Sequence, residues 1–315
     1  MTIGALLAGY VVLVGTLGAR VLRRAGWTSR APLLGIVTYL AASWSVVAAL
    51  GLAGLTLSVH ATALGGGLSH VIGACVIRLR DTYATPGGAT VAALGLILAG
   101  AVVARTALTA VADLRAAGRQ AFQHAQTARL VGRREPELGA VLVDHPGPVA
   151  YCVAGRNPTV ILTTGTLQAL DAKQLDAVLA HERAHLAGHH HLLRAIARIG
   201  RQVLPFIPLM RDTEAQVARL VELHADDAAL RASEPGPLAS ALVVLATTAG
   251  PAPALAAAAT DTVQRIHRLL RPAEPLGRAR RQLLRLNAAA IALTPVMLAL
   301  APAALALALG RVPTA

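Results

Sequence analysis

Long runs without a charged residue are the feature of this sequence that most constrains its fold. Residues 1–19, 31–77, 86–104 and 286–310 contain no Asp, Glu, Lys or Arg. A helix needs about 20 apolar residues to span a bilayer. The chain has 55% hydrophobic and only 14% charged residues, whereas soluble domains carry about 25% charged residues. The sequence therefore predicts an integral membrane protein and disfavours a wholly cytosolic one.

Four transmembrane helices and one inserted domain are expected from these runs. The region 1–112 should hold three helices and their loops, 113–284 one soluble domain, and 285–315 the fourth helix with a short tail. A stretch of this length between the spans is enough for one domain. The expected transmembrane helices lie at about 1–20, 33–57, 86–108 and 286–310.

Two further uncharged segments are not counted as spans. Residues 68–77 follow a glycine triplet and are too short to cross, so we expect a re-entrant or interfacial piece. Pro235–Thr260 is rich in alanine and interrupted by Pro251 and Pro253, which favours a helix and a loop outside the bilayer. The sequence leaves open whether this segment touches the membrane.

The net charge of +13, from 29 basic and 16 acidic residues, is concentrated on one side of the expected membrane. The loop 20–30 and the inserted domain share that side and hold nearly all the arginines. The positive-inside rule predicts that this side is cytoplasmic and that both termini lie outside. The charge then favours the lipid bilayer, and anionic lipid in particular, as a partner. We expect no direct binding of nucleic acid.

The inserted domain shows alternating signals for helices and short strands. β-Branched runs bounded by Pro and Gly predict strands at 141–143 and 159–164. Asp171 is a favourable N-cap for a helix over Ala172–Ala187. Leu192–Met210 is apolar but carries three arginines, which favours a helix lying in the membrane interface. Further helices are expected at 114–134, 214–231 and 262–270. The predicted fold class is mainly α, with four transmembrane helices and an α+β domain between the third and fourth.

The sequence His181-Glu182-Arg183-Ala184-His185 is an H-E-x-x-H motif inside the expected helix over Ala172–Ala187. Residues four apart share a helix face, so both imidazoles can bind one zinc ion, while Glu182 can act as the general base. The two cysteines, Cys75 and Cys152, are too few for a multi-cysteine zinc module or a disulfide scaffold. The motif predicts a zinc metallopeptidase with one Zn²⁺ per chain; the competing interpretation is a solvated helix end.

Two candidates compete for the third protein ligand that a catalytic zinc site requires. We favour Glu222, which is followed one turn later by Asp226, a carboxylate that can orient a ligand histidine. The less favoured candidate is His191, since His181 to His191 fits the metzincin spacing with Gly188 in place. In that alternative Met210 would serve as the residue of a Met-turn.

These motifs resemble those of the gluzincin-type integral membrane metallopeptidases, and the placement of the four spans resembles the BlaR/MecR-type antirepressor family. The resemblance rests on H-E-x-x-H, on Glu222 and Asp226, on the strand within Asn157–Gly165 and on the basic segment Arg265–Leu269. It implies that His181, His185 and Glu222 are zinc ligands, Glu182 the base and Asp226 a support for a ligand. It also implies a protein substrate, either a cytosolic transcriptional repressor or the chain itself.

One departure from that family concerns the sensor. Its antibiotic-sensing members carry a penicillin-binding domain with an S-x-x-K nucleophile. Lys173 is the only lysine in the 315 residues, and Leu170 stands three positions before it. No S-x-x-K motif therefore occurs in this sequence, and we expect no direct acylation by a β-lactam.

The predicted reaction is hydrolysis of a peptide bond, with the substrate extended along the strand formed by Thr159, Val160, Ile161, Leu162, Thr163 and Thr164. One alternative is a housekeeping membrane protease of the heat-shock or prenyl-protein-processing type. A segment crossing the membrane between the two motifs would favour it. A second alternative is a non-enzymatic four-span signalling protein. The stimulus, the cleavage sequence and a homodimeric state are left open.

Overall fold

Four long apolar helices form one end of the molecule in the computed structural model, which describes residues 2–58, 88–155, 157–248, 255–271 and 274–308. By length and composition these four helices could cross a membrane. They match the four spans expected from the sequence in number and approximate position. The helical segments that contain the apolar stretches are Ile3–Arg24, Pro32–Ser58, Ala89–Val131 and Arg278–Ala301.

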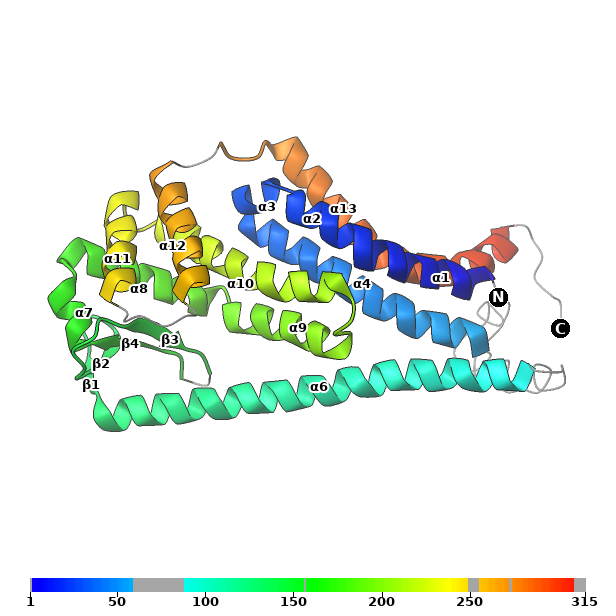
Figure 1. Cartoon of the computed structure of the whole chain (residues 1–315), viewed down its shortest axis with the longest axis horizontal. Helices are drawn as coiled ribbons and strands as arrows, with labels where there is room; N and C mark the ends of the chain where they lie inside the picture. Colours follow the sequence, from blue (N-terminus) through cyan, green and yellow to red (C-terminus); the bar gives the residue numbers. More distant parts are fainter. Residues whose placement is uncertain (1, 59–87, 156, 249–254, 272–273, 309–315) are drawn as a thin grey trace.

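The first of these stretches is built from three elements, and the second and fourth from one helix each. The first contains α1 (Thr2–Leu13), the π-helical turn η1 (Val14–Gly18) and α2 (Ala19–Arg24). The short α3 (Trp27–Arg30) connects it to the second, α4 (Pro32–Ser58), and the fourth lies in α13 (Arg278–Ala308). The start of α1 and the end of α13 lie at the same end of the molecule, away from the sheet (Figure 1).

Helix α4 is the centre of this bundle. Within its apolar window 56% of residues are buried, against 17% for each of the other three. It approaches α6 (Gly88–Val131) closely at two glycines, since a Cβ on Gly54 would lie 2.7 Å from the carbonyl oxygen of Gly95. Ser58 Oγ also donates to the carbonyl of Ala92 over 2.8 Å. Small residues thus let these two backbones meet.

Helix α6 is one continuous helix of 44 residues that leaves the bundle and reaches the sheet (Figure 1). The expected third span and the expected helix 114–134 are therefore parts of a single element, and the expected domain boundary at 112/113 falls inside it. The helix ends at Val131 rather than Arg134, because Gly132 and the strand β1 (Arg133–Glu135) follow. The expected interfacial piece at 68–77 lies outside the described residues.

The sheet has four strands in the order β1-β2-β4-β3. Strand β2 (Ala140–Val143) pairs with β1 in antiparallel and with β4 (Thr159–Thr163) in parallel fashion. Strand β3 (Ala150–Val153) pairs antiparallel with the other side of β4. Both predicted strands are present, while β1 and β3 are additional, and Thr164 begins the short helix α7 (Thr164–Ala169).

The expected substrate strand, Thr159 to Thr164, is corrected by this order. β4 is an inner strand whose backbone is paired on both sides, by β2 and by β3. An inner strand has no free row of backbone groups to offer an extended peptide. Among the described strands, β3 and β1 form the edges.

Three helices pack between the sheet and the bundle and carry the chemistry of the domain. Helix α8 has the predicted bounds, Ala172–Ala187, and begins with a capping box in which the side chains of Asp171 and Gln174 bond each other's backbone N–H. Helix α9 (His190–Val203) follows, then α10 (Pro208–Ala229). The single helix expected over Leu192–Met210 is thus broken, since Pro205 and Pro208 stand at the reversal.

The last part of the domain consists of α11 (Pro235–Thr248) and α12 (Leu255–Leu270). Helix α11 is apolar but shorter than a span, as expected for the first part of Pro235–Thr260. It packs on α8 through Leu238 and Ala239, and α12 joins the same core through Leu269. These two helices therefore close the domain over the motif-bearing helix.

Candidate metal centre

The two histidines of the motif are held on one face of α8. His181 is buried and follows the buried residues Ala177, Val178 and Leu179. His185 lies one turn further along, and its Nε2 is 3.1 Å from that of His181. The two imidazoles therefore present their Nε2 atoms to the same point in space.

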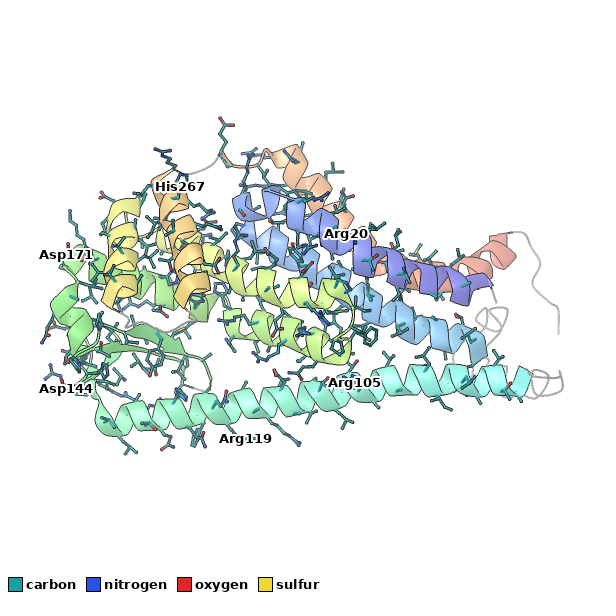
Figure 2. The ribbon with its side chains drawn as sticks, viewed as in Figure 1. Arg20, Arg105, Arg119, Asp144, Asp171 and His267 are labelled. Carbon is teal, nitrogen blue, oxygen red and sulfur yellow. The ribbon has the colours of Figure 1, made fainter. Side chains whose placement is uncertain are left out.

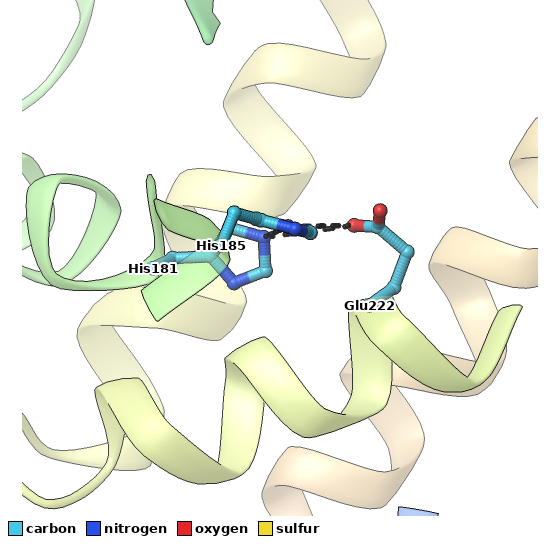
Figure 3. Close-up of side chains that lie close together, drawn as sticks. All are labelled: His181, His185 and Glu222. Carbon is cyan, nitrogen blue, oxygen red and sulfur yellow. Dashed lines mark hydrogen bonds and ion pairs between the residues drawn. The ribbon is translucent and has the colours of Figure 1, made fainter. Parts of the chain in front are cut away.

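Helix α10 brings a carboxylate to that point. Glu222 Oε2 lies 3.6 Å from His181 Nε2 and 3.6 Å from His185 Nε2, and Figure 3 shows the three side chains converging. Among the described residues they are the group of three potential ligands whose atoms lie within 4.8 Å of one another. The structure thus brings together the three residues that the sequence nominated as ligands.

The triangle of these three atoms fits a tetrahedral metal ion. With metal–ligand bonds of about 2.0–2.1 Å, two ligands of a tetrahedral ion lie about 3.3 Å apart. The observed separations of 3.1, 3.6 and 3.6 Å bracket that value. Two imidazole nitrogens and one carboxylate oxygen are also a donor set that Zn²⁺ accepts.

The charge of the surroundings is consistent with a divalent cation. Asp226 Oδ1 lies 3.0 Å from His181 Nδ1. Its carboxylate also accepts two hydrogen bonds from Arg265, at 2.7 and 2.9 Å. Three carboxylates, Glu182, Glu222 and Asp226, stand against one guanidinium, so two negative charges are left for a dication to neutralise.

Arg265 is one of the site residues that sequence reasoning missed. It comes from α12, has a side chain only 13% exposed, and also lies 3.3 Å from Glu222 Oε2. Its Nη2 is 3.4 Å from His181 Nε2. The sequence placed it in a basic segment without a role, and Asp226 stands 39 positions before it, too far for a local signal of their contact.

These contacts shift the pKa values of the candidate ligands. Burial lowers the pKa of His181, but the carboxylates of Asp226 and Glu222 outweigh it and raise that pKa to about 9. Burial raises the pKa of Glu222, yet its contacts with His181, His185 and Arg265 bring that pKa well below its usual range. The site therefore attracts positive charge to His181 and keeps Glu222 ionised, and metal binding would displace the proton.

Glu182, the second residue of the motif, contacts the sheet. Its carboxylate interacts with the thiol of Cys152 on β3. Burial raises the pKa of Glu182, against the opposing effect of the two histidines. Burial and the Glu182 carboxylate raise the pKa of Cys152 to about 12, so the thiol stays neutral. A carboxyl group with a raised pKa beside the ligand triangle suits proton transfer.

Another histidine, His190, contacts the Nδ1 atom of His185. His190 is 1% exposed, and its Nδ1 lies 2.8 Å from His185 Nδ1, while its Nε2 lies 2.8 Å from His224 Nδ1. If His185 Nε2 is kept free for a metal ion, its Nδ1–H donates to His190, and His190 Nε2–H donates to His224. Burial, with the neighbouring His185 and His224, lowers the pKa of His190 to about 3, so His190 is uncharged at neutral pH.

The turn between α8 and α9 makes room for this chain of imidazoles. A Cβ on Gly188 would lie 2.5 Å from His190 Nε2. His189 then adopts a left-handed conformation with φ of 49° and starts α9. Gly188 is therefore required by the close approach of His190 rather than by a metzincin-type turn.

The structure does not support the metzincin alternative. His191 is exposed, is absent from the ligand triangle, and packs its ring against His189 at 6.2 Å. Met210 is fully buried in the first turn of α10, within an apolar cluster that includes Val46 of α4. Met210 therefore packs the domain onto the bundle and does not lie beneath the ligands.

Comparisons with known proteins define the class of this domain. Residues 114–218 match the sequence profile described as peptidase family M48. The matched segment contains the H-E-x-x-H motif and ends before Glu222. The third ligand and Asp226 therefore rest on the geometry of α10 and not on this match.

A particular relative points the same way. The chain is similar to the plastoglobule-localized metallopeptidase 48, chloroplastic, of Arabidopsis thaliana, with 30% identity over 130 residues. The match covers 38% of this chain and 38% of the length of that relative. No solved structure matches the chain. Both matches support a metalloprotease, whereas neither names an antirepressor.

Proposed function

We propose that the chain is a membrane-anchored, zinc-dependent endopeptidase. The observation that carries this proposal is the triangle of His181 Nε2, His185 Nε2 and Glu222 Oε2 beside an acidic residue. A zinc ion at the triangle would lower the pKa of a water molecule and polarise the scissile carbonyl. Of the divalent metals, zinc fits best because the three donors leave one tetrahedral position open.

The chain's own residues supply the remaining steps. Glu182 takes a proton from the attacking water and passes it to the amine that leaves. Asp226 holds His181 by its Nδ1, and His190 holds His185 in the same way. The Asp226–Arg265 pair keeps the positioning carboxylate ionised in a buried setting.

The edge strand β3 is the best place for an extended substrate. Cys152, on this strand, contacts Glu182, and Tyr151, next to it, is 37% exposed. A peptide could add to the free edge of β3 through main-chain hydrogen bonds. β3 thus replaces Thr159–Thr164 as the proposed substrate-binding strand, and it would hold the substrate backbone next to the general base Glu182.

We further propose a regulatory role, in which the substrate is a cytosolic transcriptional repressor or the chain itself. In support, the segment between the two motifs consists of the 14-residue α9 and the first part of α10, and neither is long and apolar enough to span. The housekeeping alternative, in turn, is favoured by the match to family M48 rather than to an antirepressor. A cytoplasmic active site remains part of the proposal, with the arginine-rich loop 20–30 as its support.

The variant Glu182→Gln tests the catalytic proposal. The purified chain should hold one zinc ion by elemental analysis and cleave an unfolded protein such as casein. Glu182→Gln should keep the zinc and lose activity by about 10²- to 10⁴-fold, the usual size of a general-base contribution. Glu137→Gln, an exposed glutamate on the same domain, is the matched control and should stay active. Cleavage at the wild-type rate by Glu182→Gln would contradict the proposal.

The same variant tests the role in the cell. Expressed in place of the wild type, Glu182→Gln should retain substrates, which are identified after purification. Enrichment of a repressor supports the regulatory role, whereas enrichment of damaged membrane proteins or prenylated peptides supports the housekeeping alternative. Reporter fusions to the loop 20–30 test the sidedness, and an external reporter there would refute a cytoplasmic site.

A further inference from the structure

The reversal between α9 and α10 lies at the depth of the apolar bundle. A Cβ on Gly15 of η1 would be 2.9 Å from the side chain of Ile207. Gly15 precedes Arg20 by five residues, which is about 7 Å along a helix toward the apolar side. Val203, Leu204 and Ile207 share a core cluster with residues of α4 and α6. The tip of this helical hairpin therefore reaches the hydrocarbon layer.

An exposed apolar residue marks the same tip. Phe206 is 70% exposed, although Leu204 and Ile207 in the same turn are buried. An apolar side chain that points outward at bundle depth suits lipid rather than water. Arg105 of α6 closes the other side of the tip, since it donates to the carbonyls of Gln202 and Val203 over 2.7 and 2.9 Å.

Just above this tip the two helices enclose a groove rich in arginine. The groove has a volume of about 440 Å³. The residues that line it are Arg194, Arg198 and Arg201 of α9, and Arg211, Glu214, Ala215 and Ala218 of α10. Four cations thus share one cavity with one carboxylate.

The arginines of the groove are only partly neutralised. Arg198 pairs with Asp113 of α6, with two hydrogen bonds of 2.7 and 2.9 Å, and Arg201 lies 3.4 Å from Glu214. Arg211 donates to the carbonyl oxygen of Pro205. In the described part of the chain no carboxylate pairs with Arg194 or Arg211. The groove therefore keeps two positive charges for a ligand.

The end of the groove nearest the tip lies at the depth of the headgroup layer of a bilayer, and its Arg194 end lies above that layer. Arg201 and Arg211 lie within about one helical turn of the tip, and Arg194 about 10 Å above Arg201 along α9. The headgroup layer is about 6 Å thick on each side of the hydrocarbon core. Figure 2 shows Arg20 and Arg105 at about the same level along the long axis, as expected for residues that mark this layer.

We propose that the groove between α9 and α10 binds the headgroup of an anionic phospholipid. A guanidinium group binds a phosphate through two parallel hydrogen bonds, which suits Arg194 and Arg211. The acyl chains would lie against the exposed Phe206 at the tip. An anionic headgroup is preferred over phosphatidylcholine, because a choline cation would meet the unpaired arginines.

A lipid bound in the groove would also limit the movement of the two helices that carry residues of the metal centre. Ala218 lines the groove and Glu222 follows it by four residues on the same face of α10. Helix α9, which carries the three arginines, begins at His190. The lipid site itself depends only on the membrane placement of the hairpin and not on peptidase activity.

The experiment titrates the full-length chain, in a neutral detergent, with phosphatidylglycerol, phosphatidylcholine or inorganic phosphate, and counts bound lipid by native mass spectrometry. The wild type should bind phosphatidylglycerol in preference to phosphatidylcholine. Arg194→Gln should weaken the first binding event about fivefold, since one arginine near a membrane surface contributes about that factor. Arg20→Gln, which changes an arginine outside the groove at the level of its tip end, is the control and should leave that event unchanged.

A gain-of-binding variant guards against simple misfolding. Glu214→Gln removes the carboxylate of the groove and should tighten binding of phosphatidylglycerol. Equal affinities of the wild type, Arg194→Gln and Glu214→Gln would overturn the proposal. Competition by inorganic phosphate at concentrations similar to those of the lipid would also overturn it, and would identify a free-phosphate site. Zinc content measured in parallel tests the metal centre separately, so a failure of either idea is distinguishable.

Discussion

His181 and His185, the two histidines proposed as metal ligands, lie on one helix, yet the residues that contact them differ in charge. Asp226 contacts His181, and a buried guanidinium, Arg265, neutralises that carboxylate. His185 is contacted by the uncharged His190, which continues to His224. Carboxylates and carbonyls are the usual partners of a ligand histidine, so the imidazole partner is the departure.

Charge balance gives a physical reason for this difference. Glu182, Glu222 and Asp226 together with Arg265 already leave the two negative charges that a divalent ion neutralises. A fourth carboxylate behind His185 would leave the buried, metal-loaded site negative, and an unpaired buried charge is costly. An imidazole can fix the orientation of His185 without adding charge. Holding a histidine in position and balancing the charge of the site are therefore done by different residues.

The largest loss of stability and of zinc affinity is expected from a substitution of Asp226, on the charged side of the site. Asp226→Asn keeps the shape of the side chain but leaves Arg265 buried without its main partner. Removing one partner of a buried pair costs about 3–5 kcal/mol of folding free energy, and loss of the contact to His181 should weaken zinc binding about 10- to 100-fold. Denaturant unfolding and zinc competition with a chelator measure the two effects.

The neighbouring residue Asp227 provides a matched control. Its partner is Arg268 at 2.7 Å, but these side chains are 35% and 21% exposed. Asp227→Asn should therefore cost less than about 1 kcal/mol and leave zinc affinity unchanged. The double variant Asp226→Asn with Arg265→Met should recover part of the stability. Equal losses of stability and of zinc affinity in Asp226→Asn and Asp227→Asn would contradict the idea that the buried Asp226 differs in its role from the more exposed Asp227.

Local signals explain which parts of the fold could be predicted from sequence. The bounds of α8 follow from Asp171 as its N-cap and from Gly188 after its last residue. The four apolar helices follow from run length alone. The ligand pair His181 and His185 needs only helical spacing, and Glu222 needs only its similarity to a known motif.

Long-range contacts explain what could not be predicted. The residues of a strand do not reveal which strands pair with it, so the sequence could not predict that β4 is an inner strand and β3 an edge strand. Arg265 meets Asp226 only because α12 folds back over α10. His190 was one of three consecutive histidines, and the turn at Gly188 and His189 selects it over His191.

A smaller effect is expected on the uncharged side. His190→Leu removes the acceptor for His185 Nδ1–H and should weaken zinc binding by about tenfold or more. His190→Asn places an amide oxygen near the position of Nδ1 and should restore most of the affinity. His190→Gln places its oxygen nearer the position of Nε2, toward His224, and should not. Zinc competition with a chelator and the melting temperature of the zinc-free protein separate positioning from stability.

His191→Leu is the matched control for this side, because His191 is exposed and outside the chain of imidazoles. It should bind zinc as the wild type does. If the Asn and Gln variants of His190 behaved alike, the direction of the hydrogen bonds inferred for this side would be wrong.

The smallest effect is expected for the reactivity of Cys152. The pKa of its thiol responds to the negative charge of the nearby carboxylates at the metal centre. Burial, Glu182 and Glu222 raise its pKa to about 12, so the reactive thiolate is scarce at neutral pH and its share rises as the pH rises. In a Cys75→Ser background, alkylation by iodoacetamide should be far slower than for a free cysteine of pKa about 8.5. Glu182→Gln should lower this pKa and speed alkylation about tenfold for each unit of the decrease, whereas Glu137→Gln should not. An alkylation rate that Glu182→Gln leaves unchanged would show that the Glu182 carboxylate places no negative charge at the thiol, and the charge balance drawn from Asp226 and His190 would then fail.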